Sequence, residues 1–238
     1  LFNGWSIDSK QGGVAREIGP GDVGNPWRGH PLNRENNING IDGDANGDGQ
    51  GTEVHTLKNA AVLSIQKAYV QKVIESVGDL DNVVWEISNE STGGSQDWEY
   101  EMIRFIKAVE STRPKQHPVG MTAEYPGGDN AFLYSSEADW VSPSGTRAEP
   151  FGTAPPVATG NKVIISDTDH IWGIGGTPDW VWKTFTRGEQ PIFMDPYETE
   201  LIGPYPMYGR QPPRRPTDDR EWELLRHNMG CARKLASR

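Results

Sequence analysis

The residues best placed to do chemistry in this 238-residue chain are an amide and a carboxylate that close a short apolar run. The run covers residues 82–90, Asn-Val-Val-Trp-Glu-Ile-Ser-Asn-Glu, and ends in Asn89 and Glu90. Its β-branched and aromatic residues predict a strand buried on both faces, as in a parallel sheet. The carboxyl end of such a strand is where a βα-barrel carries out its chemistry. Asn89 and Glu90 are therefore candidate site residues, and the alternative is that they only cap the next helix.

A second stretch has the spacing of a calcium-binding loop, D-x-[DN]-x-[DN]-G-x5-E. Calcium takes about 6–8 oxygen ligands, which alternate positions of a tight loop can direct at one point. Gly47 would supply the turn, but Gly49 stands where an EF-hand usually has an apolar residue. We therefore expect a calcium loop inserted in a barrel, with a solvated acidic turn as the alternative. The predicted ligands are Asp42, Asp44, Asn46, Asp48 and Glu53.

A third candidate is the acidic ending of a later apolar run, residues 162–166. Asp167 follows this predicted strand directly, and Asp169 is a rival for the same role. Two alternatives remain open. Asp167 could cap the following turn, or Asp167, Asp169 and His170 could bind a metal, although zinc would need further ligands.

Composition limits the partners of the protein. The net charge of −10 argues against nucleic acid and anionic membrane surfaces, because phosphate binding needs clustered Lys and Arg. Nine Trp, 28 Gly and 18 Pro indicate a loop-rich protein and give a weak hint of carbohydrate binding. The single cysteine, Cys231, excludes an internal disulfide framework, and no apolar run is long enough for a membrane span. The chain opens on Leu1 without a signal-peptide pattern, which is typical of a piece of something longer.

The elements that must position these residues alternate along the chain as parallel βα units do. A helix is predicted over residues 57–77, with Val62, Ile65, Tyr69, Val73 and Val77 on its apolar face and Gly78 at its end. Further helices are predicted around residues 98–109, after Thr177 and after residue 217. Six strands are predicted, ending near Ser6, Glu90, Glu124, Ser142, Asp167 and Asp195.

This order of elements, with Asn89-Glu90 closing a strand, resembles the large clan of (β/α)8-barrel glycoside hydrolases. In that clan the fourth strand ends in Asn-Glu, and the Glu is the acid/base catalyst. The resemblance implies a single TIM-type barrel domain over residues 1–238 that lacks its first two strands, which would lie before Leu1. It also implies that Asn89 binds the substrate's 2-hydroxyl. The clan usually closes strand seven with a Glu, where this chain has Asp167, so retention or inversion does not carry over.

The sequence therefore predicts a hydrolase of O-glycosidic bonds in an oligo- or polysaccharide. Glu90 would be the general acid/base and Asp167 the nucleophile or water-activating base. We expect structural calcium, no organic cofactor, an extracellular bacterial location and a possible accessory domain outside this chain. The alternatives are a non-catalytic carbohydrate-binding barrel and a metal-dependent hydrolase centred on Asp167, Asp169 and His170. The candidate sugar contacts, besides Asn89, are Trp27, His30, Glu124, Tyr125, Asp169, His170, Trp172, Asp195 and Tyr197.

Overall fold

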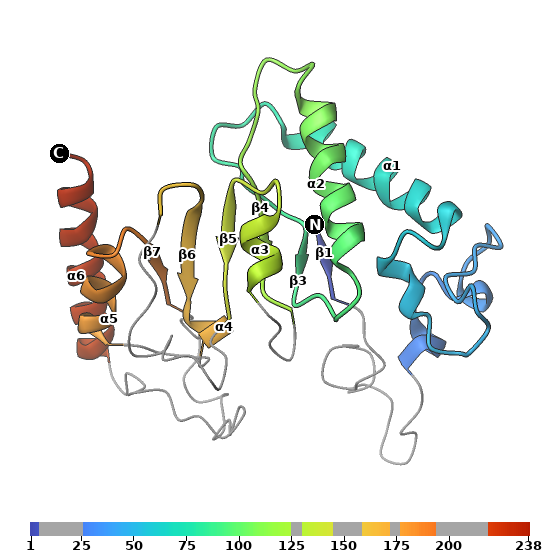
Figure 1. Ribbon diagram of the computed structural model, residues 1–238, viewed down its shortest axis with the longest axis horizontal. Coiled ribbons are helices and arrows are strands. Elements are labelled where there is room, and N and C mark those ends of the chain that lie inside the picture. The colour runs from blue at the N-terminus through green and yellow to red at the C-terminus, as the bar shows by residue number, and fades with distance from the viewer. Residues whose placement is uncertain (5–25, 125–129, 145–158, 172–176, 194–218) are drawn as a thin grey trace, which may run out of the picture. The chain divides into compact units, whose positions relative to one another are not determined.

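The computed structural model of the protein describes residues 1–4, 26–124, 130–144, 159–171, 177–193 and 219–238 (Figure 1). It is an α/β structure whose paired strands are parallel within each part. The chain divides into two compact units. The first contains residues 1–126 and 135–138, and the second contains residues 127–134 and 139–238. The parallel α/β class is thus confirmed, while a closed barrel stays a prediction.

The apolar run of residues 82–90 forms two short strands with different neighbours. β2 (Trp85–Glu86) pairs with β4 (Val119–Thr122), and β3 (Ser88–Asn89) pairs with β1 (Phe2–Asn3). Ile87 joins the two ladders, because its carbonyl accepts from the Phe2 amide at 2.9 Å and its amide donates to the Gly120 carbonyl at 3.2 Å. The expectation of burial on both faces is wrong at the start of the run, where Val84 is 61% exposed.

Helix α1 (Ala60–Val77) follows the predicted span closely, with Asn59 as its N-cap and Gly78 as its C-cap. The predicted apolar face is confirmed at Val62, which is buried, and wrong at Ile65 and Tyr69, which are 39% and 47% exposed. A glutamine lies on the buried stripe instead. Its amide nitrogen donates to the Val54 carbonyl at 2.7 Å, and its amide oxygen accepts from the Trp98 indole at 2.9 Å. The buried stripe is Val62, Gln66, Val70 and Ile74.

Helix α2 (Gln96–Glu110) packs against α1 and β4 (Figure 1). It begins after the carboxyl end of β3 and ends before the amino end of β4, so its two ends lie at opposite ends of the strands. Its buried side carries four apolar residues and, unexpectedly, two glutamates. These residues are Trp98, Glu99, Met102, Ile103, Ile106 and Glu110.

The segment before α1 is organised by short 3-10 turns rather than by strands. These turns are η2 (Pro26–Gly29), η3 (Arg34–Asn36) and η4 (Thr52–His55). Trp27, Val54 and Val62 form a small apolar core beneath them. The histidine of η4 stacks on the Trp98 ring with centroids 4.3 Å apart, which fixes this segment to α2.

In the second unit three parallel strands lie in the order β5 (Trp140–Ser142), β6 (Val163–Asp167) and β7 (Gln190–Ile192). The predicted endings at Ser142 and Asp167 are confirmed. Helix α5 (Pro178–Phe185) begins after Thr177, as predicted, and packs against β7 and α6 (Asp219–Ala236). Two short helices, α3 (Ala131–Ser135) and α4 (Thr168–Ile171), were not predicted. Among the described helices, none is long and apolar enough to span a membrane.

Candidate functional site

Polar side chains gather at the carboxyl ends of the first unit's strands. The parallel register places Asn3 opposite Asn89, and the Asn89 amide nitrogen donates to the Asn3 side-chain oxygen at 3.3 Å. Thr122, the last residue of β4, donates to the Ser88 carbonyl at 2.9 Å. The three strand ends are therefore fixed to one another by side-chain bonds as well as by backbone pairing.

Glu90 has an unusual backbone conformation immediately after β3. Its φ of 49° lies in the left-handed region, and it is the one non-glycine residue with positive φ among those that the structure describes. For an L-residue this conformation costs about 1–3 kcal/mol, so the surrounding structure must hold it. Gly4 helps to fix this conformation, because its amide donates to the Asn89 carbonyl. It also packs closely against the turn: a Cβ at Gly4 would lie 1.8 Å from the Glu90 carbonyl oxygen.

Further carboxyl groups lie around this turn. Glu124, after β4, is 8% exposed and accepts a hydrogen bond from Gln96 at 3.1 Å. Glu86 on β2 is half-buried and accepts from the Thr122 hydroxyl at 3.2 Å. Neither of these glutamates carries the backbone strain of Glu90.

Glu99 completes this group from the first turn of α2. It is fully buried, and one of its oxygens accepts from the Ser91 hydroxyl at 3.0 Å. Burial raises the pKa of Glu99 to about 8, the Ser91 bond opposes this rise, and the charges of Glu124 and Glu86 add to it. The first unit thus has one carboxyl group that keeps its proton near neutral pH, and further carboxyl groups at the same strand ends. General acid–base catalysis requires groups of both kinds.

In the second unit the predicted carboxylate closes β6 and the predicted histidine follows it. Asp167 is the last residue of the strand and is half-buried, and His170 lies in α4. The His170 ring nitrogen Nδ1 lies 2.9 Å from the hydroxyl of Ser142, the buried last residue of β5. Ends of neighbouring strands therefore meet here too. Glu90 and Asp167 belong to different units, so their pairing stays a prediction.

Trp27 and His30 lie in the core of their own loop. Trp27 is 4% exposed and stacks on the His30 ring with centroids 4.8 Å apart. A Cβ on Gly51 would lie 2.2 Å from the indole, so the backbone covers that ring as well. Burial lowers the pKa of His30 to about 4, and its Nδ1 accepts from the Leu32 amide at 3.1 Å. These contacts favour a packing role for Trp27 and His30 over direct contact with a sugar.

The predicted calcium loop has the expected turn, with Gly47 at a φ of 72°. Its acidic side chains accept from the loop's own amides: Asp44 from Asp48 at 3.1 Å and from Gly49 at 2.7 Å, and Asp48 from Gln50 at 2.8 Å. Such bonds leave lone pairs on each carboxylate. Within the described ranges no three acidic, histidine or cysteine side chains lie close enough to hold a metal.

Glu53, the last predicted ligand, is buried, whereas Asp42, Asn46 and Asp48 are exposed. It is 5% exposed, and its Oε2 is buried without a hydrogen-bond partner. A buried carboxylate oxygen in that state is costly, and a cation is one of the few partners that would satisfy it. This one feature fits the predicted ion, so calcium stays a prediction with Glu53 as its most informative residue.

Several residues of these sites were not predicted. Four of them are polar residues whose contacts can be known only when the neighbouring strands are known. They are Asn3, Ser91, Gln96 and Ser142. Glu99 did leave a signal, because it lies four and seven residues before Ile103 and Ile106 and so falls on the buried stripe of α2. The other predicted contacts, Tyr125, Trp172, Asp195, Tyr197 and the side chain of Asp169, lie outside the described residues.

Comparisons of the chain with protein families, with curated proteins and with solved structures found no match.

Proposed function

We propose that the protein is a glycoside hydrolase that cleaves O-glycosidic bonds in an oligo- or polysaccharide. Glu90 is the general acid/base, and Asp167 is the nucleophile or the base that activates water. The reaction needs two carboxyl groups because one must protonate the departing oxygen while the other attacks the anomeric carbon or deprotonates water. A protein with a net charge of −10 suits a neutral glycan better than a polyanion, and a polysaccharide substrate would place the protein outside the cell.

The backbone of Glu90 is the observation that carries this proposal. Strained backbone of this kind clusters at active sites and ligand-binding sites, where the surrounding structure holds it in place. Here the residue is a carboxylate, and it lies at the carboxyl end of a parallel strand, the end that bears active sites in α/β enzymes. A residue that only capped α2 would not need this strain, because the N-cap of that helix is Ser95.

Asp167 is proposed as the second carboxyl group on its position at the end of β6. The stereochemical outcome depends on its distance from Glu90: about 5–5.5 Å gives retention and about 6.5–9.5 Å gives inversion. Proton NMR of the first product anomer distinguishes the two. His170, held by Ser142, would contact substrate next to Asp167.

We also propose that the loop of residues 42–53 binds calcium in a structural role. Asp42, Asp44, Asn46, Asp48 and Glu53 would supply the oxygen ligands, and the unpartnered Glu53 oxygen supports this assignment.

The test of the catalytic proposal compares two substrates that differ in leaving group. Glu90→Gln should lose about 10²–10⁴-fold with a natural glycan but far less with an aryl glycoside whose leaving group departs unprotonated. Asp167→Asn should lose activity on both, and Glu223→Gln, at an exposed carboxylate of α6, serves as the control. Equal losses by Glu90→Gln on both substrates would remove Glu90 from the acid role. Glycan binding without any release of reducing sugar would favour a carbohydrate-binding protein instead.

A further inference from the structure

Helix α2 buries a glutamate at each end. Glu99 lies in its first turn and Glu110 is its last residue, and both share one stripe with Ile103 and Ile106. They are eleven positions apart along the helix, a rise of about 16 Å. Buried carboxyl groups are expensive unless they are paired, so each needs an explanation. The two environments differ in how many hydrogen bonds each carboxyl group accepts.

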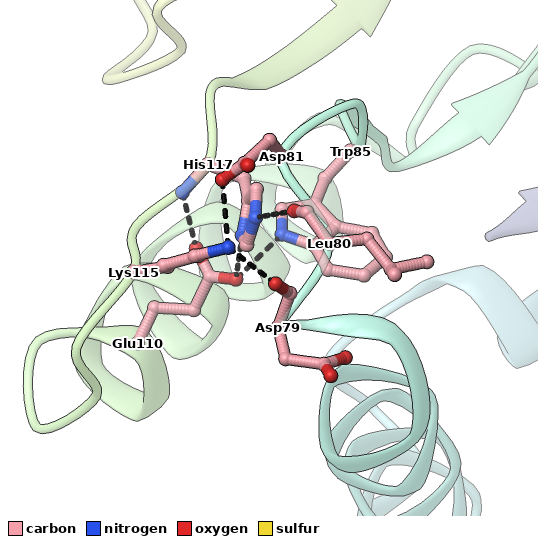
Figure 2. Close-up of polar contacts among 7 residues, drawn as sticks. All are labelled: Asp79, Leu80, Asp81, Trp85, Glu110, Lys115 and His117. Atoms are coloured by element: carbon pink, nitrogen blue, oxygen red, sulfur yellow. Dashed lines mark hydrogen bonds and ion pairs between the residues drawn. The ribbon is translucent and has the colours of Figure 1, made fainter.

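Glu110 is fully satisfied at the amino-terminal ends of β2 and β4 (Figure 2). Its carboxylate accepts from the Trp85 indole at 2.9 Å, from the His117 amide at 2.8 Å and from the His117 ring at 2.7 Å. The other nitrogen of that ring lies 2.9 Å from the Leu80 carbonyl. Beside it, Lys115 bonds to Asp79 and Asp81. Glu110 therefore connects α2 to β2 and to the residues before β4. Both of its carboxylate oxygens accept hydrogen bonds, as expected of a structural group.

Glu99 has one donor and a spare oxygen at the opposite end of the same helix. Its Oε1 accepts from Ser91, and its Oε2 is buried without a hydrogen-bond partner. The charged groups that face it are Glu86 on β2 and Glu124 after β4, both acidic. An unpartnered buried oxygen is costly, and a merely structural side chain would be expected to avoid that cost.

We propose that Glu99 is a positioning residue for Glu90, holding through the Ser91 hydroxyl the left-handed turn that presents the Glu90 carboxyl group. This inference rests on the proposed function. Ser91 directly follows Glu90, so a bond that fixes the Ser91 side chain also fixes the strained residue before it. While Glu99 keeps its proton, the turn faces a neutral group. Once Glu99 ionises, a third negative charge joins those of Glu86 and Glu124 beside the turn, while the Ser91 hydroxyl continues to donate to Glu99.

The decisive measurement is a carbon-13 NMR titration of the glutamate carboxyl groups, with the Glu90 resonance assigned from Glu90→Gln. We expect the Glu90 resonance to shift a second time near pH 8, when Glu99 ionises, and we expect this second shift to be absent from Glu99→Gln, which cannot ionise. Glu110→Gln is the matched control, because it removes a buried carboxylate from the other end of α2 and should keep the second shift. A Glu90 resonance with one shift only, or a second shift that persists in Glu99→Gln, would overturn the proposal.

Kinetics supply the second readout. With an aryl glycoside of good leaving group, wild-type kcat should fall above about pH 8, and Glu99→Gln should lack this fall. Ser91→Ala should lower kcat about tenfold with KM nearly unchanged, the effect of one lost hydrogen bond of about 1.4 kcal/mol. If no glycoside is hydrolysed, the proposed function fails, and the NMR titration still decides whether Glu99 positions Glu90.

Discussion

Replacing Glu110 by glutamine tests the polar cluster at the amino-terminal strand ends (Figure 2). The carboxylate accepts three hydrogen bonds, two of them from His117 and one from Trp85, while being 2% exposed. Glutamine has nearly the same volume but offers one acceptor oxygen and a donor NH2 group. The NH2 group would face partners that are themselves donors, so at least one buried donor loses its acceptor.

The size of the loss follows from these contacts. Leaving a buried donor unsatisfied costs about 1–3 kcal/mol, and breaking a buried ion pair by removing one partner costs about 3–5 kcal/mol. We expect Glu110→Gln to lower the free energy of unfolding by about 3 kcal/mol. Domains have total stabilities of about 5–15 kcal/mol, so the variant should still fold at room temperature.

The stability lost in Glu110→Gln should also depend on pH, because Glu110 shifts the pKa of His117. The hydrogen bond from Glu110 is the main cause that raises the pKa of His117. A group whose pKa is raised by folding contributes stability that is complete below its unfolded pKa, about 6.5 for histidine, and is lost as the pH rises through the folded value. The stability difference between wild type and Glu110→Gln should therefore be largest below about pH 6.5 and smaller at about pH 9.

Urea unfolding followed by tryptophan fluorescence at both pH values measures this difference. Glu75→Gln, on the solvent side of α1, is the control and should change stability by less than about 0.5 kcal/mol. A loss below about 1 kcal/mol for Glu110→Gln, or one of equal size at both pH values, would refute the reasoning.

Three further predictions concern the other buried groups. Millimolar calcium added after chelation should raise the Tm of the wild type but not that of Glu53→Gln, because the ion would bind only the folded state, and equal shifts would contradict the loop assignment. Gly4→Ala should lose more than about 2 kcal/mol because its Cβ would collide with the Glu90 carbonyl, whereas Gly93→Ala, with open space around it, should change stability by less than about 0.5 kcal/mol. Burial raises the pKa of Glu189 from 4.5 to about 7, so stability should fall as the pH rises through that range, and an unchanged slope in Glu189→Gln would refute this.

The elements were predictable wherever their signals are local. Gly78 ends α1, and Thr177 with Pro178 opens α5, because capping chemistry depends on a few neighbouring residues. The side of α1 that is buried was not predictable from the apolar pattern alone. Gln66 is buried only because a carbonyl and an indole, both distant in sequence, meet its amide. Tertiary hydrogen bonds of this kind override the apolar pattern.

The candidate site shows the same division. Glu90 and Asp167 could be proposed from the sequence because each closes an apolar run, which is a property of the sequence alone. Their supporting residues were not found, because Asn3 and Ser142 acquire a role only once the neighbouring strands are known. The backbone strain at Glu90 is invisible in the sequence, since nothing about the residue type predicts positive φ.

The contrast between Glu99 and Glu110 connects stability to function along one helix. A helix that returns from the carboxyl end of one strand to the amino end of the next must carry its first turn beside the site and its last turn beside the strand starts. Three hydrogen bonds to Glu110 anchor the last turn, whereas Glu99 in the first turn has one hydrogen bond, from Ser91, and one unpartnered oxygen. Loosening the anchor with Glu110→Gln should therefore lower the stability of the unit while leaving the contact between Glu99 and Ser91 in place. Of the changes to these two buried glutamates, only those at Glu99 should alter the chemistry at Glu90.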